Sequence, residues 1–549
     1  MILGTLLLSF ILRIVALEYR YFNEDEIEHL HVAYLISSGE IPYVDFFEHH
    51  LPVFHYLVSL MVQIIENPKN MIFLMRTLMF ICVIFIFFIT YKIGGKLFNK
   101  NTALLSLFFL ASNILFFEKS LEIRPDVPQT LLWVISFYTL IMGFRKKSYY
   151  CMSISGLLLG FAFTLTQKTV YVLAPVLLTF FVWCIFKTKI YDFMKRIKLF
   201  FLYLIAFSIP VAILFLYFYS IGAFKVFFDW NFVKATIWDR EIYPWDYMIR
   251  TMRQNSPFWV FGLGYSLFHF LRKFKNWKNQ PEELLMPLSV FLLIVALLLT
   301  SGPYRQTYMP ILPIVAIFAG RCFDRGINFL RGLKGGHSLS IPFILILFFA
   351  FTIPPFGEIA GETKVDNQKQ LNLIDFIHNI TEPEDSVFDG LGYGIYRPSA
   401  FYFHMLSAGV INMMGRENRE EKIIESIIDN NTKVMVYDYR VKNYLPDATK
   451  NFLLENFVPV GFLGVFVTGK DLDRDFLVNS NGFFNLISDG YYKVVVNGIE
   501  NKISVDGNML EKNNSIYLKK GNHKIAISGF YDNVVIRFDF EKNYVLNFR

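Results

Sequence analysis

Long apolar runs separated by short polar segments make up most of the first 355 residues of the chain. A run of about 17 or more apolar residues can cross a membrane, because an α-helix rises about 1.5 Å per residue and the hydrocarbon core is about 30 Å thick. We expect about eleven such helices. Their approximate limits are 1–18, 71–91, 102–117, 127–143, 150–166, 170–186, 199–219, 257–271, 284–300, 306–322 and 338–355. The pattern therefore predicts a polytopic α-helical membrane protein.

The apolar run 52–66 is only about half a bilayer long, and we interpret it as an interfacial or re-entrant segment. Composition supports a membrane protein, because 54% of the residues are hydrophobic and 18% are charged, against roughly 25% charged residues in soluble domains. The first run contains Arg13 and lacks a small-residue cleavage site. We therefore expect a retained first helix and not a cleaved signal peptide.

Lys and Arg residues gather in every second loop between the expected helices, namely in 92–100, 145–147, 187–198, 272–278 and 321–334. The positive-inside rule assigns these loops to the cytoplasm. The external segments are then 19–70, 118–126, 167–169, 220–256, 301–305 and everything after about 356. This alternation holds only if 52–66 does not span. Topology thus explains the net charge of +7, and we expect no nucleic-acid partner.

The external loop 220–256 contains Trp230, Trp238 and Trp245. Trp is enriched at membrane interfaces, where its amphipathic ring lies at the headgroup level. We expect interfacial helices in this loop.

The composition changes after Pro354-Pro355, and we predict three domains: a transmembrane domain 1–356, an α/β domain 357–475 and a β-rich domain 476–549. The α/β domain has helical apolar spacing in 368–380 and short apolar strands at 387–388 and 434–437. The β-rich domain has β-branched or alternating segments separated by turn residues, which is typical of a sandwich-like module. Neither domain carries a nucleophile triad, P-loop or metal motif. We expect them to assist acceptor binding, with Tyr393 to Arg397 as candidate glycan contacts.

Metal-binding patterns are weak in this chain. The four cysteines, Cys82, Cys151, Cys184 and Cys322, lie in or beside apolar runs, at spacings that fit no zinc site. Asp25 and His29 share a helix face at a spacing of four, and His31, His49 and His50 follow in the same loop. We expect no metal cofactor, with a divalent metal as the less favoured alternative.

Charged residues collect in the external segments, directly beside the expected helices. Two acidic residues, Asp25 and Glu26, follow the first helix, and the other candidates are His49, His50, Arg124, Asp126, Lys168, Arg305 and Tyr308. Charges next to hydrocarbon are costly unless they face water or a cavity. A carboxylate that accepts a proton, together with cations that hold a phosphate, suits transfer from a phosphate leaving group.

Several of these residues stand in segments that resemble known enzymes: Asp25-Glu26, Phe47 to Pro52, Arg124-Pro125-Asp126, Gly156 to Lys168 and Tyr308 to Pro313. In order and topology, residues 1–355 resemble the GT-C glycosyltransferases of the protein O-mannosyltransferase and lipid A aminoarabinose transferase type. The resemblance implies a polyprenyl-phosphate sugar donor, reaction at the external face and inversion of the anomeric centre. It also implies that Asp25 deprotonates the acceptor hydroxyl. Many relatives have Lys before the Pro of the first loop, where this chain has His49-His50-Leu51-Pro52.

The expected function is therefore a hexosyl- or pentosyltransferase of the inner membrane of a prokaryote, acting on a lipid, glycan or protein acceptor. Two alternatives are a flippase for a lipid-linked sugar and a membrane-anchored glycan-binding protein. A transporter would place its functional charges near the bilayer midplane. Structural roles also compete with catalytic ones: helix capping for Asp25, a salt bridge to Arg124 for Asp126, and contact with lipid headgroups for Lys168 and Arg305.

Overall fold

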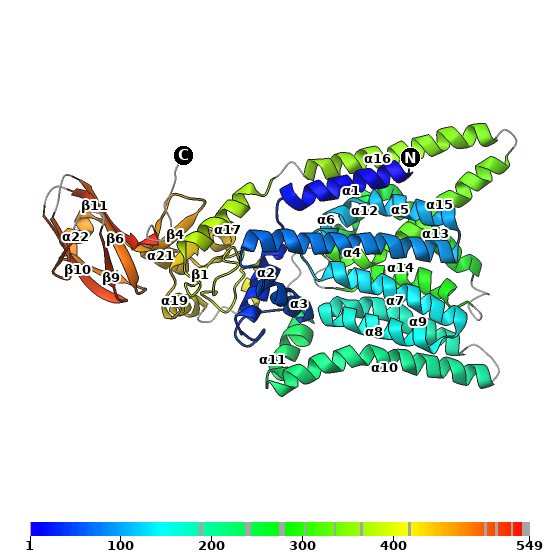
Figure 1. Cartoon of the computed structure of the whole chain (residues 1–549), viewed down its shortest axis with the longest axis horizontal. Helices are drawn as coiled ribbons and strands as arrows, with labels where there is room; N and C mark the ends of the chain where they lie inside the picture. The colour runs from blue at the N-terminus through cyan, green and yellow to red at the C-terminus, as the bar shows by residue number, and fades with distance from the viewer. Residues whose placement is uncertain are drawn as a thin grey trace. The chain divides into compact units, whose positions relative to one another are not determined.

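A computed structural model describes residues 2–185, 190–236, 243–273, 280–300, 304–333, 336–362, 366–414, 419–498, 502–510, 514–528 and 531–540 (Figure 1). The chain forms two compact units. The helical unit consists of Met1–Phe22, His49–Leu57 and Met71–Asn367. The C-terminal unit consists of Asn23–Glu48, Val58–Asn70 and Gln368–Arg549. The first loop of the chain therefore packs with the C-terminal residues, which the sequence did not predict.

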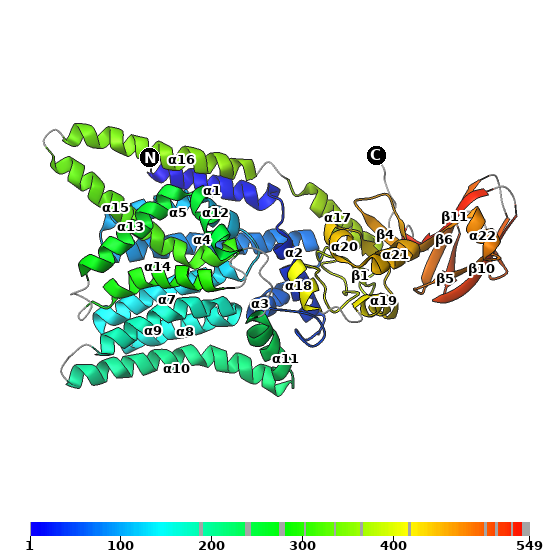
Figure 2. The same ribbon diagram turned by 180° about the vertical axis from the view of Figure 1, so that it is seen from behind.

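Helices that lie side by side build the helical unit (Figures 1 and 2). Their bounds are α1 Ile2–Tyr19, α3 Val53–Val62, α4 Pro68–Leu97, α5 Lys100–Ala111, α6 Ile114–Ser120, α7 Asp126–Lys146, α8 Tyr149–Leu165, η1 Gln167–Thr169, α9 Val170–Ile185, α10 Ile190–Ser220, α11 Phe224–Phe228, η2 Asp229–Val233, η3 Lys234–Thr236, α12 Pro244–Gln254, α13 Ser256–Lys273, α14 Glu282–Leu299, η5 Arg305–Ile311, α15 Leu312–Gly332 and α16 Gly336–Glu362. Each of the expected membrane segments falls on a helix, so the prediction of a polytopic helical membrane protein is confirmed.

The number of membrane crossings needs a correction. Among the described residues, seven helices are long and apolar enough to cross, or eight if α5 and α6, bent by 68° at their junction, form one span. The predicted crossings by α8, α13 and α15 do not belong to this group: α8 has 17 residues, α13 contains polar residues and ends on Arg272 and Lys273, and α15 carries four charged side chains. Helix α3 has 10 residues, about 15 Å of helix, which agrees with a segment that does not span.

Small residues allow close helix contact inside the unit. A Cβ atom added at Gly156 or Gly160 of α8 would lie 2.2 Å from the carbonyl oxygen of Tyr203 or Phe207 of α10, respectively. Glycine spacing of four residues is a recurring feature of tightly packed membrane helices, since it lets two backbones approach. The hydroxyl of Ser136 in α7 also donates to the Ser155 carbonyl in α8 at 2.8 Å. These contacts define how α7, α8 and α10 pack against one another, although the helices have few long polar side chains.

The basic loops assigned to the cytoplasm gather at one end of the unit. Arg145 donates to the Lys96 carbonyl at 2.9 Å and pairs with Glu282 at 2.7 Å, while Lys147 pairs with Asp192 at 2.9 Å. The ends of α4 and α7 therefore meet the starts of α10 and α14, as the alternation predicts. Trp238 and the basic residues Lys187, Lys189, Lys275, Lys278 and Lys334 lie outside the described residues.

The C-terminal unit combines helices with two sheets (Figure 2). Its helices are α2 Glu24–Ser37, α17 Gln368–Ile380, α18 Ala408–Met413, α19 Arg419–Asp429, α20 Tyr439–Tyr444, α21 Asp447–Asn456 and α22 Arg474–Asn479. One sheet has the order β1-β2-β4-β11-β6-β9, with β3 beside β4, and the other β5-β10-β7-β8. The strands are β1 Val387–Phe388, β2 Val434–Val436, β3 Phe457–Pro459, β4 Val465–Asp473, β5 Phe483–Leu486, β6 Gly490–Gly498, β7 Lys502–Val505, β8 Asn508–Leu510, β9 Ser515–Leu518, β10 Gly521–Ser528 and β11 Tyr531–Phe538.

Strand β4 connects the two predicted C-terminal domains. Its first half pairs with β2 and β3, and its second half pairs with β11. Side chains of both sheets, among them Phe484 of β5 and Ile536 of β11, share one hydrophobic core, as in a sandwich. Helix α17 coincides with the predicted helix 368–380, so this element is confirmed.

Candidate active site

The end of α1 is held by an arginine that the sequence analysis did not single out. Arg76 lies in the apolar helix α4 and is 1% exposed. Its guanidinium donates to four carbonyl groups at this end, including those of Arg20 at 2.9 Å and Tyr21 at 3.3 Å. It also lies over the ring of Phe22, 4.3 Å from the centroid. Because a helix leaves its last carbonyls without partners, this contact fixes the chain where it leaves α1.

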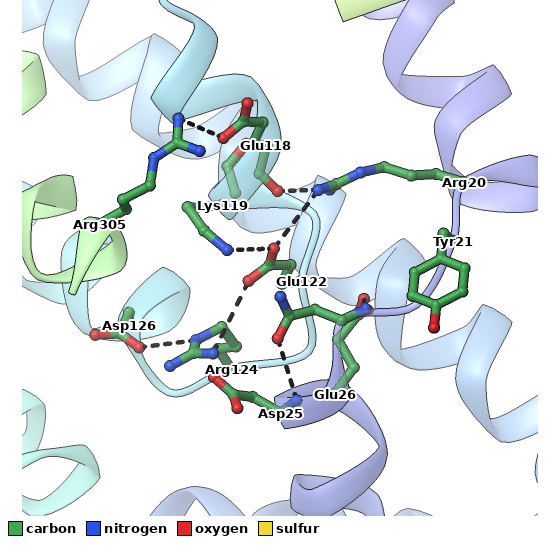
Figure 3. A network of polar contacts seen from close by, with 12 residues as sticks. Arg20, Tyr21, Asp25, Glu26, Glu118, Lys119, Glu122, Arg124, Asp126 and Arg305 are labelled. Atoms are coloured by element: carbon green, nitrogen blue, oxygen red, sulfur yellow. Dashed lines mark hydrogen bonds and ion pairs between the residues drawn. The ribbon is translucent and has the colours of Figure 1, made fainter. Parts of the chain in front are cut away.

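A buried charge network begins in the segment between α6 and α7 (Figure 3). Glu122, with no exposed surface, accepts from Lys119 at 2.7 Å and lies 3.5 Å from Arg20 and 3.9 Å from Arg124. Arg124 also donates to Asp126 at 3.3 Å. Residues 118–126 thus turn four charged side chains toward one another at the end of the helical unit opposite the basic loops.

Two further cations reach this network from distant helices. Lys168, in η1, lies 3.6 Å from the carboxylate of Asp126. Arg305, the first residue of η5, pairs with Glu118 at 2.7 Å and also donates to Gln254 (Figure 3). The structure therefore brings together four residues predicted for the site: Arg124, Asp126, Lys168 and Arg305.

Cations and carboxylates alternate in this group. Five cations, Arg20, Lys119, Arg124, Lys168 and Arg305, form ion pairs with three carboxylates, Glu118, Glu122 and Asp126. Burial lowers the pKa of Arg124, and the neighbouring Asp126 opposes that shift. Guanidinium and ammonium groups form charge-assisted hydrogen bonds to phosphate oxygens, which makes the network a candidate phosphate site.

His50, in the first loop, is a poor candidate for a permanent cation. Burial first, and then the nearby Lys168, lowers the pKa of His50 to about 3, so this ring is neutral at physiological pH. The rings of His49 and His50 lie 3.9 Å apart, and the His49 carbonyl accepts from Gln167 at 2.8 Å. Glu48 joins the two imidazoles in a group whose possible ligand atoms all lie within 4.8 Å of one another, so the divalent metal stays an alternative. A neutral imidazole still offers one N–H donor.

Tyr308 follows Arg305 by three residues in the same 3-10 helix, a spacing that puts both side chains on one face. The ring is fully buried, and its hydroxyl has no hydrogen-bond partner among the described residues. Buried hydroxyl groups are nearly always paired, so this one is a candidate donor to a ligand.

Asp25 and Glu26 lie in the first turn of α2, in the C-terminal unit. Asn23 is the N-cap and accepts from the Asp25 amide at 3.1 Å, while Glu26 accepts from the Asn23 amide at 2.9 Å. This reciprocal capping box assigns the capping role to Asn23 and Glu26. The capping alternative for Asp25 is therefore not supported, whereas Glu26 is fully buried and has a structural function.

The tyrosines considered as glycan contacts have structural partners. The hydroxyl of Tyr393 accepts from Gln370 at 3.2 Å, and that of Tyr396 donates to the Ile65 carbonyl at 2.8 Å. Arg397 donates to the carbonyls of His378 and Thr381 at 2.7 Å each, at the end of α17. All three side chains are buried. The hypothesis that they present open faces to a glycan is not supported, because the fold uses those faces.

Comparison with known proteins agrees with this chemistry. Residues 49–214, which include Arg124, Asp126 and Lys168, match the family model described as dolichyl-phosphate-mannose-protein mannosyltransferase. This segment of the chain is similar to that family. The predicted resemblance and the enzyme class, a glycosyltransferase dependent on a dolichyl- or polyprenyl-phosphate sugar, are thereby confirmed. No curated protein sequence matches the glycosyltransferase.

Two solved structures share the fold of the glycosyltransferase. ArnT from Cupriavidus metallidurans bound to undecaprenyl phosphate has 11% sequence identity and a TM-score of 0.60, over 85% of this chain and 97% of ArnT. The oligosaccharyltransferase AglB from Archaeoglobus fulgidus, in complex with an inhibitory peptide and a dolichol-phosphate, has 14% identity and a TM-score of 0.51, over 79% of this chain and 69% of AglB. At these identities the likeness concerns the fold.

Proposed function

We propose that this glycosyltransferase moves a hexose or pentose from a polyprenyl-phosphate donor to an acceptor hydroxyl at the external face, with inversion of the anomeric centre. The buried network around Glu122 and Asp126 carries the proposal. It gathers five cations on three carboxylates in the helical unit, and two of those cations, Arg124 and Lys168, lie in the segment that matches the family.

The cations of the network suit the leaving group. In the reaction the bond between the anomeric carbon and the phosphate oxygen breaks, and the polyprenyl phosphate departs with the electron pair. Arg124, Lys168 and Arg305 stabilise the charge that develops on the phosphate, because fixed cations in a site with little water act strongly on it. The hydroxyl of Tyr308 donates a hydrogen bond to a phosphate oxygen, and the rings of His49 and His50 contribute further hydrogen-bond donors.

Asp126 orients the two cations beside it. Its carboxylate lies 3.3 Å from Arg124 and 3.6 Å from Lys168, so it holds both groups in place before the donor binds. Preorganised charges need no rearrangement in the transition state. In this assignment the salt bridge between Asp126 and Arg124, which was the structural alternative for Asp126, is itself part of the proposed function.

Asp25 is the proposed general base. It accepts the proton of the acceptor hydroxyl as the new bond to the anomeric carbon forms on the face opposite the leaving phosphate, which inverts the configuration. Its side chain is half-buried in the first turn of α2. Glu26 supports this turn through the capping box and does not take part in proton transfer.

The experiment uses the purified full chain in lipid nanodiscs with a panel of polyprenyl-phosphate hexoses and pentoses. We expect release of polyprenyl phosphate, and a glycoside whose anomeric configuration, measured by NMR, is opposite to that of the donor. Retention of configuration would contradict the mechanism.

A second experiment tests on which side of the membrane the C-terminal unit lies. Asn508→Cys in a background without the native cysteines should react with a membrane-impermeant maleimide in intact cells. Protection until lysis would place the C-terminal unit in the cytoplasm and contradict the external site.

A further inference from the structure

The first turn of α2 is unusually acidic. Glu24, Asp25, Glu26 and Glu28 are four of its first five residues. Acidic groups favour a helix N-terminus, but carboxylates this close also repel one another. Glu26 is engaged in the capping box. The arrangement of the other carboxylates therefore depends on which groups of the C-terminal unit face them.

Glu24 is held by two side chains that lie more than 400 positions further along the chain. Its carboxylate forms an ion pair with Arg440 and accepts from the hydroxyl of Tyr439 at 2.5 Å. The Arg440 side chain is 8% exposed and that of Glu24 is 31% exposed, so water screens this pair less than a surface pair. The contact anchors the residue directly before Asp25.

The backbone around Arg440, at the start of α20, is itself held by hydrogen bonds. Asp438 caps α20 by accepting from the amides of Arg440 at 2.8 Å and Val441 at 3.0 Å, and it also accepts from the Gly390 amide at 2.7 Å. Arg440 donates back to the Gly390 carbonyl at 3.3 Å. A Cβ atom at Gly390 would lie 2.7 Å from that of Arg440. The start of α20 and the loop after β1 therefore lock together.

The loop after β1 contacts α2 about two turns further on. The ring of His31 lies 3.3 Å from the Ile395 carbonyl, and the loop is shaped by Asp389, which accepts from the amides of Gly392 at 2.5 Å and Gly394 at 3.0 Å. Helix α2 is thus held at two places, by the ion pair of its first residue with Arg440 of α20 and by the contact of His31 with this loop.

The neighbouring carboxylates account for a cation at position 440. Burial first, and then Glu48, raises the pKa of Glu28 to about 8, while Arg440 opposes that shift. Burial disfavours the charged form of Arg440, but Glu24 outweighs it, and the pKa of Arg440 is raised. Arg440 is therefore a permanent cation among carboxylates that would otherwise repel one another. The planar guanidinium group of Arg440 also fixes the direction of its hydrogen bonds, which the flexible ammonium group of a lysine would do less well.

We infer that Arg440 is a positioning residue for the transfer reaction: through its ion pair with Glu24 it sets the first turn of α2, and with it the carboxylate of Asp25. This inference rests on the proposed role of Asp25 as general base. It gives the C-terminal unit a part in the chemical step in addition to the predicted part in acceptor binding. Because Asp25 is adjacent to Glu24 in the chain, a shift of Glu24 moves the base relative to its substrate.

A double-mutant cycle on the full chain tests the inference. Arg440→Gln and Glu24→Gln should each lower kcat about tenfold, with the KM for the donor unchanged within about twofold, because each leaves one member of the pair without its partner. The double variant should be no slower than the slower single variant. A double variant about a hundredfold slower than wild type would mean that the two residues act independently, and would overturn the inference.

Arg397→Met is the matched control. Arg397 is also a buried arginine of the C-terminal unit, but it donates hydrogen bonds to Thr381, Tyr396 and His378 and not to Glu24. We expect a lower melting temperature and an unchanged kcat per folded molecule. If Arg440→Gln behaves in the same way, its role is only structural and the inference fails.

The failure of the inference can be separated from the failure of the proposed function. Asp25→Asn is assayed beside the cycle. If Asp25→Asn abolishes transfer and Arg440→Gln leaves kcat unchanged, the general base stands and the positioning role is contradicted. If Asp25→Asn retains transfer, the proposed base is wrong, whatever the cycle shows.

Discussion

The helical unit and the C-terminal unit both bury charged side chains, but in different arrangements. In the helical unit Arg124 and Lys168 both lie beside Asp126. In the C-terminal unit Arg440 stands among Glu24, Glu28 and Asp438. Fixed cations suit a phosphate leaving group, whereas an acidic cluster held by one arginine suits a group that accepts protons. Under the proposed mechanism, the first arrangement acts on the leaving group and the second on the acceptor.

The two networks also differ in how they are built. Glu118, Lys119, Glu122, Arg124 and Asp126 lie in one short segment, and distant helices add Arg20, Lys168 and Arg305. The pair of Glu24 and Arg440 joins residues 416 positions apart. A local network survives small shifts of the fold, whereas a long-range pair depends on correct packing of the whole unit. Four variants test this comparison, in order of decreasing expected effect.

The largest effect is expected for Asp25→Asn, which removes the proposed base and keeps the shape of the side chain. Transfer should fall by about 10²-fold or more, because general-base catalysis contributes about that factor. Expression and melting temperature should not change, since Asn23 and Glu26 make the cap. Asp45→Asn, an exposed acidic residue of the same loop, is the control and should keep its rate. Near-normal turnover of Asp25→Asn would exclude this assignment.

Asp126→Asn tests the cationic side of the comparison. The change leaves Arg124 and Lys168 without the carboxylate that lies between them, so the stability should fall by about 3 kcal/mol, as for other buried ion pairs that lose one partner. Turnover should fall as well, because the two cations are no longer oriented. Thermal melting and kcat are measured on the same preparation. A protein that melts earlier but turns over normally would reduce Asp126 to a structural salt bridge.

Arg305→Ala should weaken donor binding about tenfold, which corresponds to about 1.4 kcal/mol. The reason is the loss of one cation from the proposed phosphate site, opposite Glu118. Affinity is measured by titration with polyprenyl phosphate in nanodiscs. Arg331→Ala removes an exposed arginine at the end of α15 and is the control for net charge. Equal affinities in the two variants would mean that Arg305 does not contact the donor.

The smallest effect concerns Glu28, whose pKa is raised from 4.5 to about 8 in the folded chain. Between these values the folded protein binds more protons than the unfolded protein, so stability falls as pH rises, by up to about 1.4 kcal/mol per pH unit. Glu28→Gln should remove this slope. Melting temperatures of both proteins between pH 5 and pH 8 check the prediction. Parallel curves would show that Glu28 does not stay protonated in the acidic cluster.

Much of the helical unit was predictable, because the length of an apolar run is a local property of the sequence. Each expected membrane segment is a helix, and the alternation of basic loops matches the contacts of Arg145 and Lys147 at one end. The number of candidate crossings was overestimated at α8, which is short, at α13, which contains polar residues and ends on two cations, and at α15, which carries four charged side chains. The role of Arg76 was not predicted for a different reason. A single cation in an apolar run does not indicate its partners, and only the folded structure shows that Arg76 binds the carbonyl groups at the end of α1.

The sequence by itself determined the class of the protein and most of the candidate site, because Arg124, Asp126, Lys168 and Arg305 stand at helix ends whose order along the chain is enough to bring them to one end of the unit. Only the tertiary structure decided what holds Asp25. Helix α2 packs with residues that follow Gln368, and Glu24 meets Arg440. Local pattern cannot indicate such a partner, because the pairing is set by the packing of a whole unit and not by the spacing of residues along the chain.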